Sequence, residues 1–342
     1  MENILVLHNS VCEDSAEEKQ SAWQESYAGV LEEVKAVCGS LEKIGIDYQV
    51  ESISRIEQLP QLLGRTPHRL VFNLVESLSG GIFDACYVPT VCRSFNKLCS
   101  GTDTAGLLLA QDKWRSKAIF RGSGIPCPDG VVVPAGEKFD SSNLPQGLYI
   151  VKPALTDASE GIDANSVAEL SSPSLTRAIK CIHEQFGQPA LVEQFIEGRE
   201  INVSVLERNG RLMVLPIAEI DFSAFDAGKR RIVDYAAKWK TNSFEYNNTP
   251  RILPAKISSR LQSLIHSYTK DVFRVIGCQD YARVDFRLDE NENVYVLEVN
   301  PNPDISPDAG FAAAVAAGGL SYEDFIKIVL DNVLERLNKD QG

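Results

Sequence analysis

The chain has 342 residues, of which 44% are hydrophobic and 24% are charged, and this composition excludes an intrinsically disordered protein. At roughly 100–200 residues per domain, the length predicts two or three domains. The formal net charge of −13 argues against non-specific binding of DNA or RNA, which needs a basic surface, but a few local cations suffice to bind a phosphorylated small molecule.

The compartment is predicted from cysteine usage and from the apolar runs. The eight cysteines form no CxxC pair and no zinc-like spacing. The sequence MENILVLHNS begins with an acidic residue after Met and is not typical of a signal peptide. Residues 309–320 form the longest weakly polar run, which is too short to span a bilayer. We therefore expect a reduced, cytoplasmic enzyme or binding protein with no membrane contact.

The first third of the chain alternates strands and helices. Residues 4–9, 47–53 and 69–75 have the short apolar runs of strands. Residues 18–43 have apolar side chains at helical spacing. This order predicts a small parallel α/β unit that ends near residue 105.

The rest of the chain changes character near residue 190. Before it, residues 104–120 predict a helix that is interrupted near Asp112. Residues 131–133 and 148–153 predict two strands, and residues 175–186 predict a helix that follows them. After it, closely spaced strands predict an antiparallel sheet that includes residues 190–196, with a helix inserted at 258–276 and a last helix at 322–337. The predicted domains are residues 1–105, 106–189 and 190–342.

Polar side chains interrupt two neighbouring apolar strands near the C-terminus. Arg283 and Asp285 share one face of the first strand, and Glu298 and Asn300 share one face of the second, because strand side chains alternate with period two. A short acidic turn joins the strands into a predicted hairpin, so the four side chains can converge. Two carboxylates and an amide oxygen suit Mg²⁺. The alternative is a solvated polar face of an exposed hairpin.

Other motifs carry a resemblance. The segments VKPA, VEQFIEGRE, DYAAKW, ARVDF and LEVNPNP, in this order, resemble the ATP-grasp ligases and, within them, the D-alanine–D-alanine ligase branch, over residues 112–334. The resemblance implies a mixed α/β and α+β protein with an ATP-grasp fold and an N-terminal Rossmann-like (pre-ATP-grasp) α/β domain. It implies an ATP-dependent ligase that joins a small, amino-acid-like carboxylate and amine through an acyl phosphate, and a homodimer formed through the first domain.

The resemblance also implies a role for each matching residue. The phosphates of ATP would contact Lys113, Lys152 and Ser159. Lys238 would reach the γ-phosphate from a mobile loop, and Arg283 would stabilise the oxyanion of the tetrahedral intermediate.

The nucleoside and the metals would use a second set of residues. Glu193 would meet the adenine amino group, the backbone of Gln194, Phe195 and Ile196 would meet the rest of the adenine edge, and Glu200 would bind the ribose. Two Mg²⁺ ions, with Mn²⁺ as an alternative ion, would bind Asp285, Glu298 and Asn300. Residues 156–162 and 234–240 are the expected lids, because an acyl phosphate must be kept from water.

The match fails where the family holds its amino-acid substrates. The N-terminal Gly-Gly-x-Ser-x-Glu motif is missing, although Glu17 or Glu18 could replace its Glu. Glu76 stands where the family has a His, and Trp239 replaces a Tyr.

The acceptor end also departs from the family. Asp304 replaces a Gly, and Ala309 and Gly310 replace the Ser-Leu pair that grips the acceptor carboxylate. Asp304 and Asp308 would repel a carboxylate and attract a cationic amine. We therefore expect a substrate pair other than two D-alanines. A true D-alanine–D-alanine ligase, a non-catalytic nucleotide-binding regulator and a kinase-like enzyme that stops at the phosphorylated acid remain alternatives.

Overall fold

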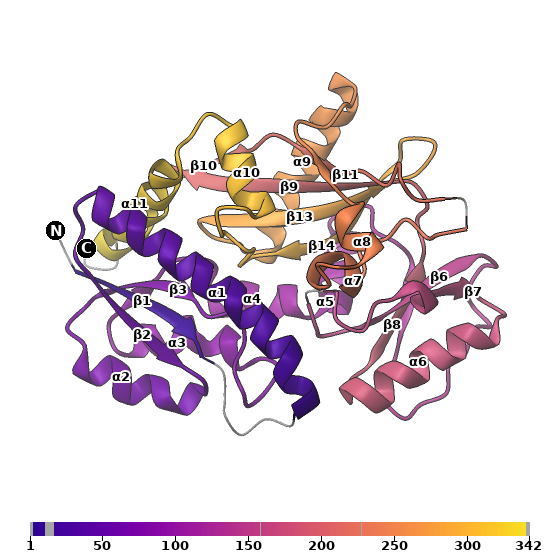
Figure 1. The fold of residues 1–342 in the computed structure, drawn as a ribbon, viewed down its shortest axis with the longest axis horizontal. Helices are drawn as coiled ribbons and strands as arrows, with labels where there is room; N and C mark the ends of the chain where they lie inside the picture. Colours follow the sequence, from indigo (N-terminus) through magenta and orange to yellow (C-terminus); the bar gives the residue numbers. More distant parts are fainter. Residues whose placement is uncertain (1–2, 11–16, 158, 227, 340–342) are drawn as a thin grey trace.

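A computed structural model describes residues 3–10, 17–157, 159–226 and 228–339, with the backbone alone for residues 17–26 and 339. Three β-sheets and the helices around them form three parts that meet at the centre of the molecule (Figure 1). None of the helices in these residues is long and apolar enough to cross a membrane.

The first part is a parallel sheet in the order β2-β1-β3-β4, as predicted. Its strands are β1 (Ile4–Asn9), β2 (Tyr48–Ile53), β3 (Leu70–Leu74) and β4 (Leu98–Cys99). Alternate residues of β1 pack on opposite faces, because α1 (Glu17–Lys43) and the C-terminal α11 (Tyr322–Lys339) cover one face while α2 (Leu59–Arg65) and α3 (Val88–Ser94) cover the other. Continuous burial of β1 and β3 is the pattern expected for parallel strands covered on both sides.

The second part is an antiparallel sheet in the order β5-β8-β6-β7, at the lower right of Figure 1. Its strands are β5 (Gly130–Val133), β6 (Leu148–Pro153), β7 (Val167–Glu169) and β8 (Ala190–Gln194), and α6 (Pro173–Phe186) packs on it. The prediction that placed β8 in the C-terminal sheet is wrong, because β8 pairs with β5 and β6. We keep the division into three domains as a proposal and move its second boundary to the end of β8.

The third part is the large sheet, in the order β12-β11-β9-β13-β14 with β10 beside β9. Its pairings are antiparallel, as predicted. The strands are β9 (Arg199–Arg208), β10 (Arg211–Val214), β11 (Ala218–Ile220), β12 (Arg251–Ile252), β13 (Tyr281–Leu288) and β14 (Val294–Asn300). The long helix α9 (Ser259–Ile276) covers one face, and the short helices α7 (Tyr235–Trp239) and α8 (Phe244–Asn247) lie toward the second part (Figure 1).

Two helices connect the first part to the others. The predicted interruption at Asp112 is confirmed: α4 (Thr104–Gln111) ends there and α5 (Lys113–Gly122) begins, with the Asp112 carboxylate accepting hydrogen bonds from the N–H groups of Trp114 and Arg115. This N-cap fixes Lys113 at the first position of α5. The remaining helix, α10 (Gly310–Ala317), follows β14.

Candidate active site

The three parts enclose a cavity of about 540 Å³, within the size range of small-molecule sites. The residues that the resemblance assigned to the nucleotide, the metal ions and the oxyanion all line this cavity: Lys113, Lys152, Ser159, Glu193, Gln194, Phe195, Ile196, Glu200, Lys238, Arg283, Asp285, Glu298 and Asn300. The structure thus brings together residues that lie almost 190 positions apart in the chain.

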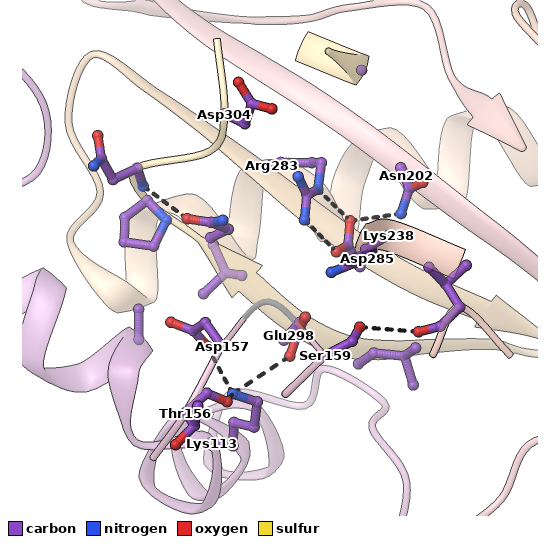
Figure 2. A pocket seen from close by; sticks show the side chains of 18 of the residues that line it. Lys113, Thr156, Asp157, Ser159, Asn202, Lys238, Arg283, Asp285, Glu298 and Asp304 are labelled. Atoms are coloured by element: carbon purple, nitrogen blue, oxygen red, sulfur yellow. Dashed lines mark hydrogen bonds and ion pairs between the residues drawn. The ribbon is translucent and has the colours of Figure 1, made fainter. Parts of the chain in front are cut away.

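The hairpin of β13 and β14 forms the centre of the site. Asp285 lies opposite Glu298 and Arg283 opposite Asn300, and a bulge follows Asp285. Arg283 donates two hydrogen bonds to Asp285, from Nε to Oδ1 at 2.8 Å and from Nη2 to Oδ2 at 3.0 Å (Figure 2). Asn202 on β9 donates a third, from Nδ2 to Oδ1 at 2.8 Å. The predicted convergence of the four side chains is confirmed.

The donor set of this hairpin fits a hard divalent cation. Burial raises the pKa of Glu298, but Lys113, Lys152 and other nearby cations outweigh it and lower that pKa to about 2, so the carboxylate is ionised. Among the described residues, no three His, Cys, Asp or Glu side chains are grouped as a metal site. A metal ion here would therefore also need the amide oxygen of Asn300 and oxygens of the substrate, which is how Mg²⁺ usually binds in phosphate sites.

Lys113 is held at the cavity wall by acidic and carbonyl oxygens. Its Nζ lies 2.7 Å from Asp157 Oδ1 and 3.9 Å from Glu298 Oε2, and it donates a 2.6 Å hydrogen bond to the carbonyl of Thr156. Burial lowers the pKa of Lys113, but the charges of Asp157 and Glu298 outweigh burial and raise it. The ammonium group of Lys113 is therefore a fixed positive charge that faces the carboxylate of Glu298, the candidate metal ligand (Figure 2).

Lys152 shares a buried carboxylate with a lysine that the sequence analysis missed. Glu193, which is 1% exposed, lies 2.7 Å from the Lys152 Nζ and 3.0 Å from the Lys117 Nζ. Burial opposes the charge of Glu193, but the two lysines hold its pKa below the usual value. Lys117 also donates a 2.7 Å hydrogen bond to the carbonyl of Leu297 in β14. This cluster fixes α5, β6 and β8 against the central hairpin.

The segment after β8 has the free donor that an adenine edge requires. The N–H groups of Gln194 and Phe195 are used within the protein, by the carbonyls of Asp129 at 2.7 Å and Leu148 at 2.9 Å. The N–H of Ile196 has no hydrogen-bond partner among the described residues. Of the predicted backbone contacts, Ile196 is therefore the position with a donor open to a ligand.

Glu200 lies deeper along β9, beside an arginine. Arg287 Nη2 is 3.1 Å from Glu200 Oε2, and Arg287 also donates to the carbonyls of Gly198 and Arg231. Burial raises the pKa of Glu200, and the charge of Arg287 partly offsets this effect. The carboxylate faces the cavity as a hydrogen-bond acceptor, as a ribose contact requires.

The two predicted lids contact each other over the cavity. The Ser159 hydroxyl donates a 3.0 Å hydrogen bond to the carbonyl of Val233, and the Tyr235 N–H donates a 3.1 Å hydrogen bond to the carbonyl of Ile162. Lys238, on α7, projects into the cavity near Arg283 and Asp285 (Figure 2). Burial and the neighbouring Arg283 lower the pKa of Lys238.

Carboxylates dominate the opposite end of the cavity. Glu76 and Asp304 both line it, and in Figure 2 Asp304 lies on the other side of Arg283 from Lys113. Desolvation and the charges of Asp304 and Asp157 raise the pKa of Glu76 to about 8. The pKa of the buried Glu33 is raised by burial, by Glu76 and by Asp304. The side chains of Glu17 and Glu18 lie outside the described part of the chain.

Three residues of the site escaped the sequence analysis although a simple signal was present. Lys117 lies one helical turn after Lys113, and Asn202 and Arg287 lie two residues beyond the predicted site residues Glu200 and Asp285 on the same strands. Helical and strand periodicity place each of them beside its predicted neighbour. The same helical and strand periodicity, applied to every polar residue near the motifs, would have identified Lys117, Asn202 and Arg287 as neighbours of the site.

Comparison with known proteins identifies similar sequences and folds. The family model "D-ala D-ala ligase C-terminus" matches residues 137–331. The chain is 34% identical to the D-alanine–D-alanine ligase of Carboxydothermus hydrogenoformans, over 70% of this chain and 74% of the relative. It is 33% identical to the uncharacterized protein y4sG of Sinorhizobium fredii, over 80% of this chain and 76% of the relative.

The fold is also similar to that of a solved structure. The D-alanine–D-alanine ligase from Bacillus anthracis, complexed with ATP, superposes with a TM-score of 0.75, covers 100% of both chains and is 19% identical. This similarity confirms the predicted ATP-grasp architecture, with its mixture of helices and several sheets.

Proposed function

Because the chain belongs to the D-alanine–D-alanine ligase family of ATP-grasp proteins, we propose that it is an ATP-dependent ligase that joins a carboxylate to an amine. The observation that carries this proposal is the convergence of Lys113, Lys152, Arg283, Asp285 and Glu298 on one cavity. Cations for phosphates, acidic ligands for a metal and an arginine for an oxyanion are the parts that acyl-phosphate chemistry needs.

ATP would lie between the second and third parts, with its adenine at the segment after β8. Ile196 offers the open N–H, Glu193 a carboxylate and Glu200 an acceptor for the ribose. Lys113, Lys152 and Ser159 would contact the phosphates. Two Mg²⁺ ions, or Mn²⁺ in their place, would be held by Asp285, Glu298 and Asn300 and would neutralise phosphate charge when bound.

The residues of the site would then stabilise negative charge in two successive steps of the reaction. A carboxylate is a poor electrophile, so transfer of the γ-phosphoryl group from ATP to one of its oxygens first creates an acyl phosphate and releases ADP. Lys113, Lys152 and Lys238 would stabilise the negative charge that spreads over the transferred group. The amine then attacks the acyl carbon, phosphate leaves, and Arg283 would stabilise the tetrahedral oxyanion.

Contact between the two lids supports exclusion of water during these steps. The bonds from Ser159 to Val233 and from Tyr235 to Ile162 close the loop after β6 against the segment that carries Lys238. An acyl phosphate hydrolyses in water, so a closed site protects the intermediate. The lids would have to open to admit substrates, as lids of this kind do in other enzymes.

We propose that the substrate pair differs from two D-alanines. Asp304 places negative charge at the acceptor end of the cavity, and Ala309 cannot supply the hydroxyl with which the family grips a carboxylate. An unpaired charge in such a pocket costs several kcal/mol of binding free energy, roughly. The Asp304 carboxylate therefore favours an ammonium group on the second substrate.

The test is ADP release in the presence of ATP and Mg²⁺ across single and paired amino acids, D-alanine included, with Glu298→Ala as the inactive control. We expect ADP release that requires an acid–amine pair other than D-alanine alone, together with an amide product detected by mass spectrometry. Turnover with D-alanine as the only substrate would make the chain a D-alanine–D-alanine ligase and refute the pocket argument.

Two other outcomes would replace the ligase proposal. Accumulation of a phosphorylated acid without any amine would indicate a kinase-like enzyme. Nucleotide binding with no ADP release from any pair would indicate a regulator. We also propose a homodimer formed through the first α/β part, which sedimentation velocity would test.

A further inference from the structure

Arg251 presents a free cation to the cavity. It is the first residue of β12, where it pairs with Ile220 of β11, and its side chain lines the cavity. Its guanidinium group has no hydrogen bond and no ion pair with any described residue, although Arg283 and Arg287 in the same cavity each have a carboxylate partner. A guanidinium in this state is open to a ligand.

The surroundings of Arg251 are shaped by a small residue. A Cβ atom added to Gly310 would lie 3.3 Å from Arg251 Nη2 and 3.4 Å from its Nε, so the guanidinium packs against the Gly310 backbone. Ala309, the N-cap of α10, gives this helix no side-chain cap. Both residues line the cavity. The two positions where the family has a Ser-Leu pair are therefore small here, and an arginine occupies the space beside them.

Arg251 lies at the acceptor end of the site, beside Gly310. Burial and the charge of Arg283 lower the pKa of Arg251, and the charges of Asp304 and Asp308 partly offset this effect. Neither Asp304 nor Asp308 reaches it within ion-pair distance. Asp304 lies beyond Arg283 from the phosphate-binding Lys113 in Figure 2. Arg251 is thus near Arg283, the proposed oxyanion residue, at the end of the cavity that Ala309 and Gly310 line.

We propose that Arg251 binds the carboxylate of the second substrate, in the absence of the serine at position 309. The inference rests on the proposed ligase function and deepens it by naming the residue that recognises the acceptor. Arginine matches a carboxylate with two parallel N–H donors, which gives both strength and orientation. The ammonium end of an amino-acid acceptor would meet the carboxylate of Asp304. Arg251 therefore replaces, from a different strand, the serine that is missing at position 309.

Equilibrium binding tests the inference without requiring turnover. The full chain, loaded with Mg²⁺ and a non-hydrolysable ATP analogue, is titrated in a calorimeter with a panel of amino acids and with the α-carboxamide of each. We expect at least one amino acid to bind about tenfold or more tightly than its carboxamide, because only the acid can form the charged hydrogen bonds. Arg251→Gln should remove this preference, and Arg251→Lys should retain part of it.

Two further variants separate the subsite from general damage. Gly310→Leu should weaken binding of the amino acid but not of its carboxamide, because the new side chain occupies the position of the guanidinium. Arg260→Gln, on the exposed surface of α9, is the matched control and should leave both affinities unchanged. Thermal unfolding of each variant checks that it is folded.

The results distinguish the inference from the function on which it rests. Equal binding of acid and carboxamide, no binding of any amino acid, or weaker binding of the ATP analogue alone in Arg251→Gln would each overturn the role of Arg251. A carboxylate preference that depends on Arg251, found together with no ADP release from any substrate pair, would overturn the ligase proposal and leave the subsite standing.

Discussion

Arg283 and Asp285, two residues apart on β13, hold each other through two parallel hydrogen bonds of 2.8 and 3.0 Å. One of them is proposed to stabilise an oxyanion and the other to bind a metal ion. Their contact fixes the position of the proposed oxyanion donor relative to the proposed metal ligands, so a change in either residue should disturb both functions.

Replacement of Asp285 tests this coupling. Asp285→Asn keeps the size of the side chain but removes the charge that orients Arg283 and binds the metal, so we expect kcat for ADP release to fall about 100-fold or more. The Mg²⁺ concentration needed for half-maximal activity should also rise, because the proposed metal site has lost one charged ligand. Asp271→Asn, which removes an exposed partner of Arg274 on α9, should change neither quantity. Unchanged kcat in Asp285→Asn would contradict the assignment.

The buried pair of Lys117 and Glu193 makes a prediction about stability. Both side chains are 1% exposed and their charged atoms are 3.0 Å apart. Lys117→Met removes one partner of a buried pair, so we expect the free energy of unfolding to fall by about 3–5 kcal/mol. Urea denaturation measures this change. Lys180→Met, which breaks a pair that is 70% and 64% exposed, should cost less than about 1 kcal/mol. Similar losses in the two variants would refute the structural role of Lys117.

Asp157 makes a prediction about ATP affinity. Its carboxylate, 52% exposed, lies 2.7 Å from the Lys113 Nζ and therefore competes with a phosphate for that ammonium. Asp157→Asn removes the competitor and a repulsive charge, so we expect KM for ATP to fall about two- to fivefold, the range of an exposed ion pair. Glu184→Gln, which breaks the exposed pair with Lys180 on α6, serves as the control. A higher KM in Asp157→Asn would show that Asp157 helps to bind the nucleotide.

The raised pKa of Glu76 makes a prediction about pH. Its pKa is about 8 in the folded protein and near its usual value of 4.5 in the unfolded chain, so the folded state holds a proton that the unfolded state releases between these values. The stability that this proton provides is present below the unfolded pKa and is lost as the pH rises through 8. We expect the melting temperature to fall between about pH 5 and about pH 9, and to fall less in Glu76→Gln.

The pKa of Glu33 is also raised, so part of the decrease in melting temperature with pH should remain in Glu76→Gln. Circular dichroism melts at matched ionic strength measure both proteins. Parallel curves for the two would show that Glu76 titrates normally.

The sequence predicted the centre of the site because that part depends on local rules. Period-two alternation and a short turn were sufficient to bring Arg283 and Asp285 opposite Asn300 and Glu298. The N-cap at Asp112 was visible as a helix interruption, and it placed Lys113. The resemblance then connected these residues to Lys152 and Glu193 on other elements.

Features that depend on tertiary contacts could not be predicted in the same way. The apolar residues of β8 are equally compatible with either neighbouring sheet, and only the pairing with β5 and β6 decides between them. Arg251 lies on a two-residue strand in a segment without a motif, and its proximity to Gly310 spans 59 positions of the chain. The interaction of Lys117 with Glu193 likewise joins a helix to a strand far along the sequence.

The most direct measurement of the central claim follows oxygen-18 from a labelled carboxylate substrate, using the acid–amine pair that gives ADP release. Ligation through an acyl phosphate transfers one carboxylate oxygen to the released phosphate and leaves the other in the amide. We predict one labelled oxygen in the phosphate for each amide formed, and no label in phosphate when the Glu298→Ala protein is used. Unlabelled phosphate alongside an amide product, or ADP release without any amide, would contradict the account.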